Sequence, residues 1–167
     1  MNVLDLIGWS RTVVARCTLA VIVGAGVPAV MHAEVRVRVV ETDPASPATL
    51  GRDETFYVRI EYDTDEPIRI WARPFFQGTP VAAKSNPSIT YTGRGEALGW
   101  FALDDAVDVD EIRIIVGGGT PYRESQATTY PVSLSGSGHA AAPRRPAEWV
   151  APLERAAADA ARREQER

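Results

Sequence analysis

Acidic residues crowd the segment 104–111, which holds the strongest candidate metal ligands of the chain. The aspartates Asp104, Asp105, Asp108 and Asp110 offer hard oxygen ligands of the kind that Ca²⁺ prefers. Further carboxylates stand in an earlier connection, at Glu41, Asp43, Asp53 and Glu54. The spacing lacks the glycine and the terminal glutamate of an EF-hand loop. Because acidic loops are usually just solvated, we expect no cofactor and keep calcium as an alternative.

The middle of the chain lacks the residues that nucleophilic catalysis and zinc binding require. The histidines are His32 and His139, and the one cysteine is Cys17, so all three lie near or beyond the ends of the segment 34–136. This excludes Ser–His catalysis, cysteine nucleophiles and His/Cys zinc sites from that segment. A glycosidase with paired carboxylates would need a cleft that a small β-domain seldom provides. We therefore predict that the protein is not an enzyme.

The segment 66–76 alternates aliphatic residues with cationic and aromatic ones. One set is Ile68, Ile70 and Ala72, and the other is Arg69, Trp71 and Arg73. Successive side chains of a strand point to opposite faces. The aliphatic set must face the core, since two unpaired buried guanidiniums would cost far more than one tryptophan gains. We expect Trp71 on the outer face with the arginines stacked on its ring, either as a stabilising ladder or as a binding patch.

A glycine-rich connection at 117–125 is the second candidate recognition element. Tyr122 and Arg123 are expected near its tip, and tyrosine and arginine are common binding anchors. The alternative is a plain hairpin connection. The predicted partner-binding residues are Arg69, Trp71, Arg73, Arg113, Tyr122 and Arg123. A further hypothesis places Trp71, Trp100, Phe75 and Phe76 in one aromatic platform for sugar rings.

Short alternating runs separated by clusters of turn residues predict an all-β domain. The clearest run is 56–62, and we expect residues 63–67 to form a turn between it and a central strand at 66–76. The parity of 96–103 is ambiguous, because both of its faces carry apolar residues. Either both faces are covered, or a bulge at Gly99 switches them. Seven or eight antiparallel strands in two sheets fit this spacing.

The sequence VDEIRIIVGGG followed by TTYPVSL resembles the last two strands of fibronectin type III and bacterial immunoglobulin-like domains. The resemblance covers roughly residues 34–136 and implies an immunoglobulin-like β-sandwich with Greek-key connections. The chain departs from the pattern in two respects: there is no cysteine pair, and no corner tyrosine precedes Ile112. Domains of this type mostly bind or space other molecules, so the resemblance also implies a role without catalysis.

Residues 1–33 have the features of a signal peptide. Arg11 and Arg16 precede the apolar run 17–30, which is short for a membrane span. Small residues allow cleavage after Ala29 or after Ala33. The alternative is an uncleaved anchor, which would be the protein's contact with the membrane. In both cases we expect the following domain to be periplasmic or extracellular.

The C-terminal region divides into a flexible linker at 137–146 and a charged, alanine-rich helix at 147–167. Pro152 suits the first turn of a helix, and Trp149 is the one large apolar anchor. The apolar stripe is too thin to form a core. The helix therefore stands in solvent, lies on the sandwich with Trp149 as a clasp, or pairs with a partner.

The charge pattern limits the possible partners. The chain of 167 residues carries a formal net charge of −4 without a basic stripe, which argues against nucleic-acid binding. We expect an exported, non-enzymatic interaction or scaffold module of the bacterial cell envelope that binds an envelope protein. The alternatives are a carbohydrate or cell-wall binding module and a calcium-rigidified adhesion or spacer domain.

Overall fold

The computed structural model describes residues 35–87 and 89–167, and within these ranges the chain forms strands followed by one helix. The elements are β1 (Arg36–Asp43), β2 (Ala48–Arg52), β3 (Thr55–Phe76), β4 (Thr79–Pro80), β5 (Ala83–Ser85), β6 (Thr90–Leu103), β7 (Asp108–Gly118), β8 (Arg123–Ala140) and α1 (Val150–Gln165). The predicted all-β domain with a C-terminal helix is confirmed. The immunoglobulin-like assignment stays a prediction.

The predicted leader, residues 1–33, lies outside the described residues, so its cleavage and its use as an anchor stay predictions. Within the described ranges, no helix is both long enough and apolar enough for a membrane span.

Strand β3 is the longest element and organises the fold. It runs for 22 residues without reversing direction, so the predicted turn at 63–67 is wrong. A register shift between Thr64 and Ile68 bends the strand there instead. The buried Thr64 hydroxyl stabilises the bend, because it donates to the carbonyl oxygen of Glu66 at 2.8 Å and accepts from the Glu66 N–H at 3.2 Å. The DTDEP segment is thus a corner within one strand.

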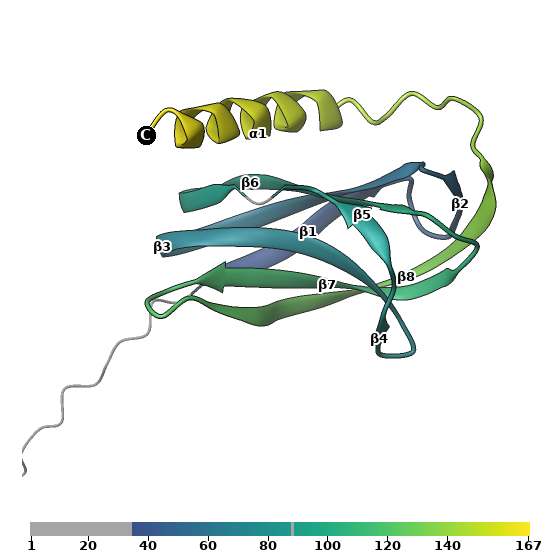
Figure 1. Cartoon of the computed structure of the whole chain (residues 1–167), viewed down its shortest axis with the longest axis horizontal. Coiled ribbons are helices and arrows are strands. Elements are labelled where there is room, and N and C mark those ends of the chain that lie inside the picture. The colour runs from purple at the N-terminus through teal and green to yellow at the C-terminus, as the bar shows by residue number, and fades with distance from the viewer. Residues whose placement is uncertain (1–34, 88) are drawn as a thin grey trace, which may run out of the picture. The chain divides into compact units, whose positions relative to one another are not determined.

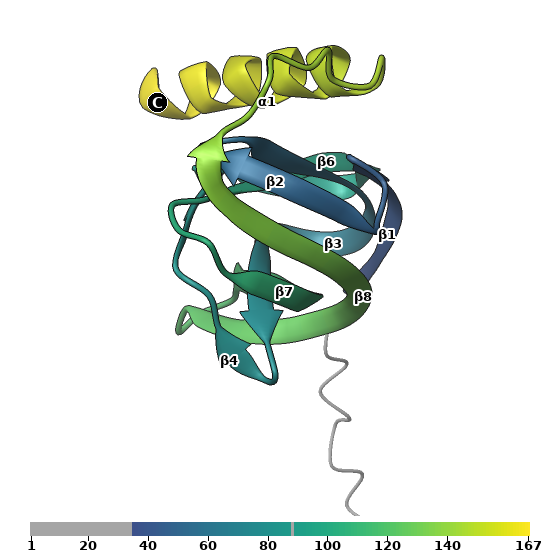
Figure 2. The same ribbon diagram turned by 90° about the vertical axis from the view of Figure 1, so that its right-hand side faces the viewer.

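The two halves of β3 belong to different strand groups. The first half pairs with β1 and β6, whereas residues 68–75 pair with β7. Strand β8 follows β7 and then curves on to β2, as Figure 2 shows. The β2–β8 pair is parallel, so the prediction of exclusively antiparallel strands is wrong for this pair. Its consequence is a mixed sheet ordered β2-β8-β7-β3-β6-β5, with β1 and β4 also paired to β3.

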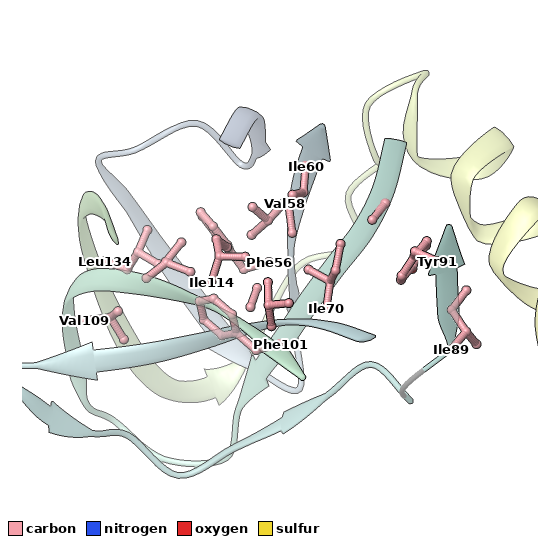
Figure 3. Close-up of a cluster of buried hydrophobic side chains, with 14 of the residues drawn as sticks. Phe56, Val58, Ile60, Ile70, Ile89, Tyr91, Phe101, Val109, Ile114 and Leu134 are labelled. Carbon is pink, nitrogen blue, oxygen red and sulfur yellow. The ribbon is translucent and has the colours of Figure 1, made fainter. Parts of the chain in front are cut away.

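The core fills the space between the two strand groups (Figure 3). Phe56 and Phe101 stack at its centre with ring centroids 5.2 Å apart. The predicted parity of β3 is confirmed: Ile68, Ile70 and Ala72 are at most 3% exposed, and the intervening residues point outward. Alternation was decisive here because only one of the two faces can be apolar throughout.

Strand β6 has buried residues on both faces, as the first of the two predicted alternatives required. Phe101 and Leu103 belong to the core, whereas Leu98 is 5% exposed but lies outside the core cluster. The β3–β6 register continues past Gly99 without a shift, so no bulge switches the faces.

Helix α1 covers the outer side of β6 (Figure 1). The linker predicted at 137–146 begins later than expected, because β8 continues to Ala140. The helix also starts later than predicted, at Val150, with Pro152 inside its first turn. Of the three placements considered for the helix, the one against the strands is correct, and α1 belongs to the same compact unit as the strands.

Candidate functional site

The predicted partner-binding residues lie on adjacent segments of β3, β7 and β8 and in the connection between β7 and β8, and we call their surface the arginine–aromatic face. It comprises Arg69, Trp71, Arg73, Arg113, Tyr122 and Arg123. In the β3–β7 register, Arg73 stands directly opposite Arg113, and Trp71 stands opposite Ile115. Arg123 begins β8 opposite Gly118. Pairing along β3, β7 and β8 therefore brings together residues that are far apart in the sequence.

Two arginines of this face lie over aromatic rings. The Arg73 guanidinium carbon is 5.6 Å from the centroid of the half-buried Trp71 ring, as the alternation predicted. The Arg113 guanidinium carbon is 3.9 Å from the centroid of Phe75, a contact that the sequence reasoning missed. Phe75 has the same parity along β3 as residues 69, 71 and 73, so the alternation could have placed it on the same face. Each contact stabilises its arginine by roughly 0.5–1 kcal/mol at an exposed site.

Tyr122 folds back onto the strands instead of standing at the tip of a long loop. The predicted loop at 117–125 is shorter than expected, because β7 ends at Gly118 and β8 begins at Arg123. A Cβ atom at Gly117 would overlap the Tyr122 hydroxyl and would lie 2.9 Å from Cζ3 of Trp71. Tyr122 and Trp71 therefore meet over Gly117. Tyr122 is nevertheless 53% exposed, so it presents an aromatic surface next to Trp71.

Carboxylates border the arginines of the face. Arg73 Nη2 lies 3.1 Å from Glu124 Oε2, and Arg113 Nε donates to Glu111 Oε1 at 2.7 Å. Exposed ion pairs such as Arg73–Glu124 contribute roughly 0–1 kcal/mol, so an incoming carboxylate can replace them at little cost. The pairs hold the guanidiniums in place without removing them from solvent.

Arg69 lies where the arginine–aromatic face approaches the end of α1. Its register partner Thr90 donates its backbone N–H to Glu164 Oε1 at 2.6 Å. Hydrogen bonding by Thr90, and then the charges of Arg69 and Arg167, lower the pKa of the Glu164 carboxyl. Arg69 thus also supports the docking of the helix, a role that the sequence reasoning did not foresee.

The aromatic residues do not form the common platform proposed for sugar rings. Trp100 stands opposite Tyr57 on β3 and lines the space beneath α1, away from the β7 side on which Trp71 lies. Phe75 is 8% exposed beneath Arg113. Phe76 is more exposed, at 37%, but it follows Phe75 and therefore points away from it. That prediction is wrong because it ignored which sheet face each strand presents.

The candidate calcium ligands do not converge. Lys84 Nζ lies 2.5 Å from Asp53 and 3.3 Å from Asp104, and these two contacts raise the pKa of the lysine. Asp110 accepts the backbone N–H of Gln77 at 2.9 Å. Across residues 35–87 and 89–167, no three histidine, cysteine or carboxylate side chains come together as a metal site would require. A lysine between two of the acidic segments opposes a cation at that corner.

The segment between β8 and α1 is fixed to the domain by the partly buried carboxylate of Asp43. Asp43 Oδ1 lies 2.5 Å from Arg144 Nη1, and Asp43 Oδ2 accepts the backbone N–H of Ala147 at 2.9 Å. The Asp43 side chain is 13% exposed, and Glu54 adds a 3.3 Å contact to Arg144 Nε. The helix that follows begins with Val150, which is 1% exposed. Composition predicted a flexible linker here, but long-range contacts order it.

Comparison of the chain with protein-family models, with curated proteins and with solved structures finds no match.

Proposed function

We propose that this protein is an exported, non-catalytic interaction module that binds an envelope protein through the arginine–aromatic face. The observation that carries the proposal is the arrangement of Trp71 and Tyr122. Both lie over Gly117, one beneath Arg73 and the other 53% exposed, on the β7 side of β3, whereas α1 packs mainly on β6. Binding energy in protein interfaces is concentrated in tryptophan, tyrosine and arginine side chains.

The chemistry of the face favours a partner segment that carries carboxylates. Arg73 and Arg113 stand opposite each other, and the exposed Arg73–Glu124 pair is the one that an incoming carboxylate can replace, whereas Arg113 is held by Glu111. Arginine pairs with carboxylates through two parallel hydrogen bonds, which gives direction as well as attraction. A sugar ring would instead need an open, flat aromatic surface, and the aromatic residues are divided between two faces. A protein partner is therefore preferred to a carbohydrate.

The strand pairing supports an immunoglobulin-like assignment for the domain. Constant-type immunoglobulin domains order their sheets A-B-E-D and C-F-G. The order β1-β3-β6-β5 corresponds to A-B-E-D, and β3-β7-β8 corresponds to C-F-G, if the two halves of β3 serve as B and C. The departure is that B and C form one bent strand here. Domains of this architecture commonly bind through an outer sheet face or through their end loops.

Export rests on the sequence of residues 1–33, whose charge and apolar pattern are those of a signal peptide. A periplasmic or extracellular location follows from that pattern. In this proposal the protein is a β-sandwich domain of the cell envelope with a protein-binding role.

Site-specific photo-cross-linking tests the proposal. A photoreactive amino acid at position 122 is expected to give a discrete protein adduct in cell envelopes, and Trp71→Ala is expected to abolish that adduct. The control position is Arg38, whose side chain is 70% exposed on β1, a strand that pairs with β3 and not with β7 or β8. Equal adducts from positions 122 and 38, or an adduct that survives Trp71→Ala, would contradict the proposal. Capture of a glycan in place of a protein would replace it with the carbohydrate alternative.

A further inference from the structure

A cavity of about 250 Å³ lies between α1 and the outer side of β6. Leu98 and Trp100 of β6 line it from below, and Ala157 and Ala161 of α1 line it from above. A second space of about 230 Å³ adjoins it along Leu98 and Ala157. Figure 3 shows Ile89 and Tyr91, which line both spaces, on the side of the strands nearest the helix. Well-packed interiors seldom leave gaps of this size between elements.

The cavity arises from a mismatch in side-chain size. The sheet presents large apolar side chains, whereas the helix lies on them mainly through alanines. Leucine at positions 157 and 161 would fill the space, and leucine has a helix propensity nearly as good as that of alanine. The gap is therefore not imposed by the helical sequence.

The helix is held at both ends by contacts that lie outside the cavity. Asp43 binds Arg144 and the Ala147 N–H before the helix, and Glu164 accepts the Thr90 N–H near its end. Between these ends Ala157, Ala160 and Ala161 pack against the core cluster, and the cavity remains beside them. Small-molecule sites have this form: a largely apolar, pre-formed space with a few polar groups at its margin.

The polar groups at the margin restrict the charge of a ligand. Asn86 is 7% exposed, and its Oδ1 already accepts the Trp100 N–H at 3.1 Å, so it has little capacity for a further ligand. Glu154 hydrogen-bonds with the Tyr57 hydroxyl, and its carboxylate disfavours an anion and keeps lone pairs that can accept from a ligand hydroxyl. An apolar cavity of roughly 150 Å³ is enough to bind benzene. The larger space here suits one or two fused rings, for which the ring of Trp100 provides a flat wall.

We propose that the cavity between α1 and β6 binds an uncharged aromatic molecule of one or two rings that carries a hydroxyl group directed at Glu154. The site is separate from the arginine–aromatic face and does not depend on it.

Calorimetric titration of the full chain with 2-naphthol tests this proposal, with 2-naphthoate as the charged probe of similar shape. Saturable binding of 2-naphthol is expected, and 2-naphthoate should bind at least about tenfold more weakly. Ala161→Leu fills the cavity and should weaken 2-naphthol at least about tenfold while keeping or raising the melting temperature. Ala151→Leu is the matched control: this residue is exposed near the start of the same helix and does not line the cavity, so the variant should bind like the wild type.

Three results would overturn the proposal. They are the absence of saturable 2-naphthol binding by the wild type, equal binding of the two probes, and unchanged binding by Ala161→Leu. If Ala161→Leu instead lowers the melting temperature, the leucine disturbs the helix contact, and binding of the two probes by Glu154→Gln tests the proposal in its place. That substitution removes the charge at the margin without altering the helix contact. It should bring 2-naphthoate to within about threefold of 2-naphthol, and an unchanged preference would contradict the site.

Discussion

The two outer faces of the strands cover their tryptophans in different ways. Both expose a half-buried tryptophan, Trp100 on β6 and Trp71 on β3. Trp100 is covered by the protein's own helix α1, whereas Trp71 is covered in part by Arg73 and Tyr122. A helix that remains bound removes a surface from recognition. Arginine side chains cover an apolar surface with their stems while their charged groups stay in solvent. We therefore propose that protein recognition occurs on the arginine–aromatic face, where Tyr122 is 53% exposed.

The largest effect should follow removal of the cover. Deletion of residues 147–167 exposes Leu98 and Trp100 and should lower the melting temperature on the order of 10 °C. Thermal unfolding followed by circular dichroism measures this, and binding of a hydrophobic dye should increase at the same time. An unchanged melting temperature would mean that α1 contributes nothing to the stability of the domain.

The next largest effect is expected at Asp43, which fixes the segment before α1 to the domain. Asp43→Ala leaves Arg144 and the Ala147 N–H without their shared acceptor, and should reduce the free energy of unfolding by about 2 kcal/mol. Asp63→Ala is the matched control, because its ion pair with Arg94 is exposed and should contribute less than about 0.5 kcal/mol. Chemical denaturation compares the two variants. Equal losses would show that the Asp43 contacts are no more than a surface ion pair.

A smaller effect is expected at Gly117 on the arginine–aromatic face. Gly117→Ala introduces a Cβ where Tyr122 and Trp71 meet, so it should cost about 1 kcal/mol and displace the tyrosine ring. Adding Tyr122→Ala should recover part of that loss, and a double-mutant cycle measures the coupling. Strictly additive losses would indicate that Tyr122 does not rest on Gly117.

The smallest effect is expected for Glu164→Gln, whose effect on the melting temperature should depend on pH. The folded-state pKa of Glu164 lies below its ordinary value of 4.5, so its contribution to helix docking is complete above that pH and is lost as the pH falls through the lowered pKa. Glu164→Gln should therefore lower the melting temperature by roughly 2 °C at pH 7 and by less at pH 3. Melting curves of both forms across this range provide the test. A difference that grows toward pH 3 would contradict the assignment.

Local alternation was enough to predict much of the fold. The burial of Ile68, Ile70 and Ala72 and the outward position of Trp71 followed from the cost of burying charge, which needs no knowledge of partners. The helix followed from intrinsic propensity. Of the candidate site, the Arg73–Trp71 stacking is confirmed, and the binding role of its residues stays a prediction.

Long-range pairing accounts for what the sequence did not predict. DTDEP has the composition of a turn, but pairing with β6 on one side and β7 on the other keeps β3 extended through it. The segment at 141–149 has the composition of a linker, but Asp43, more than a hundred residues earlier, orders it. Trp100 is covered because α1 docks on β6 through alanines. The apolar stripe of the helix is thin, so the sequence left this docking as one of three alternatives. In each case the deciding contact lies far away in the sequence.

The most direct test of the central claim compares Trp71→Ala with Trp100→Ala in the same chain. For each variant, the free energy of unfolding and the yield of the partner adduct from position 122 are measured together. We predict that Trp71→Ala loses the adduct at a cost of less than about 1 kcal/mol. Trp100→Ala should keep the adduct and lose about 2 kcal/mol. Retention of the adduct in Trp71→Ala, or its loss in Trp100→Ala alone, would contradict the division between a face for stability and a face for recognition.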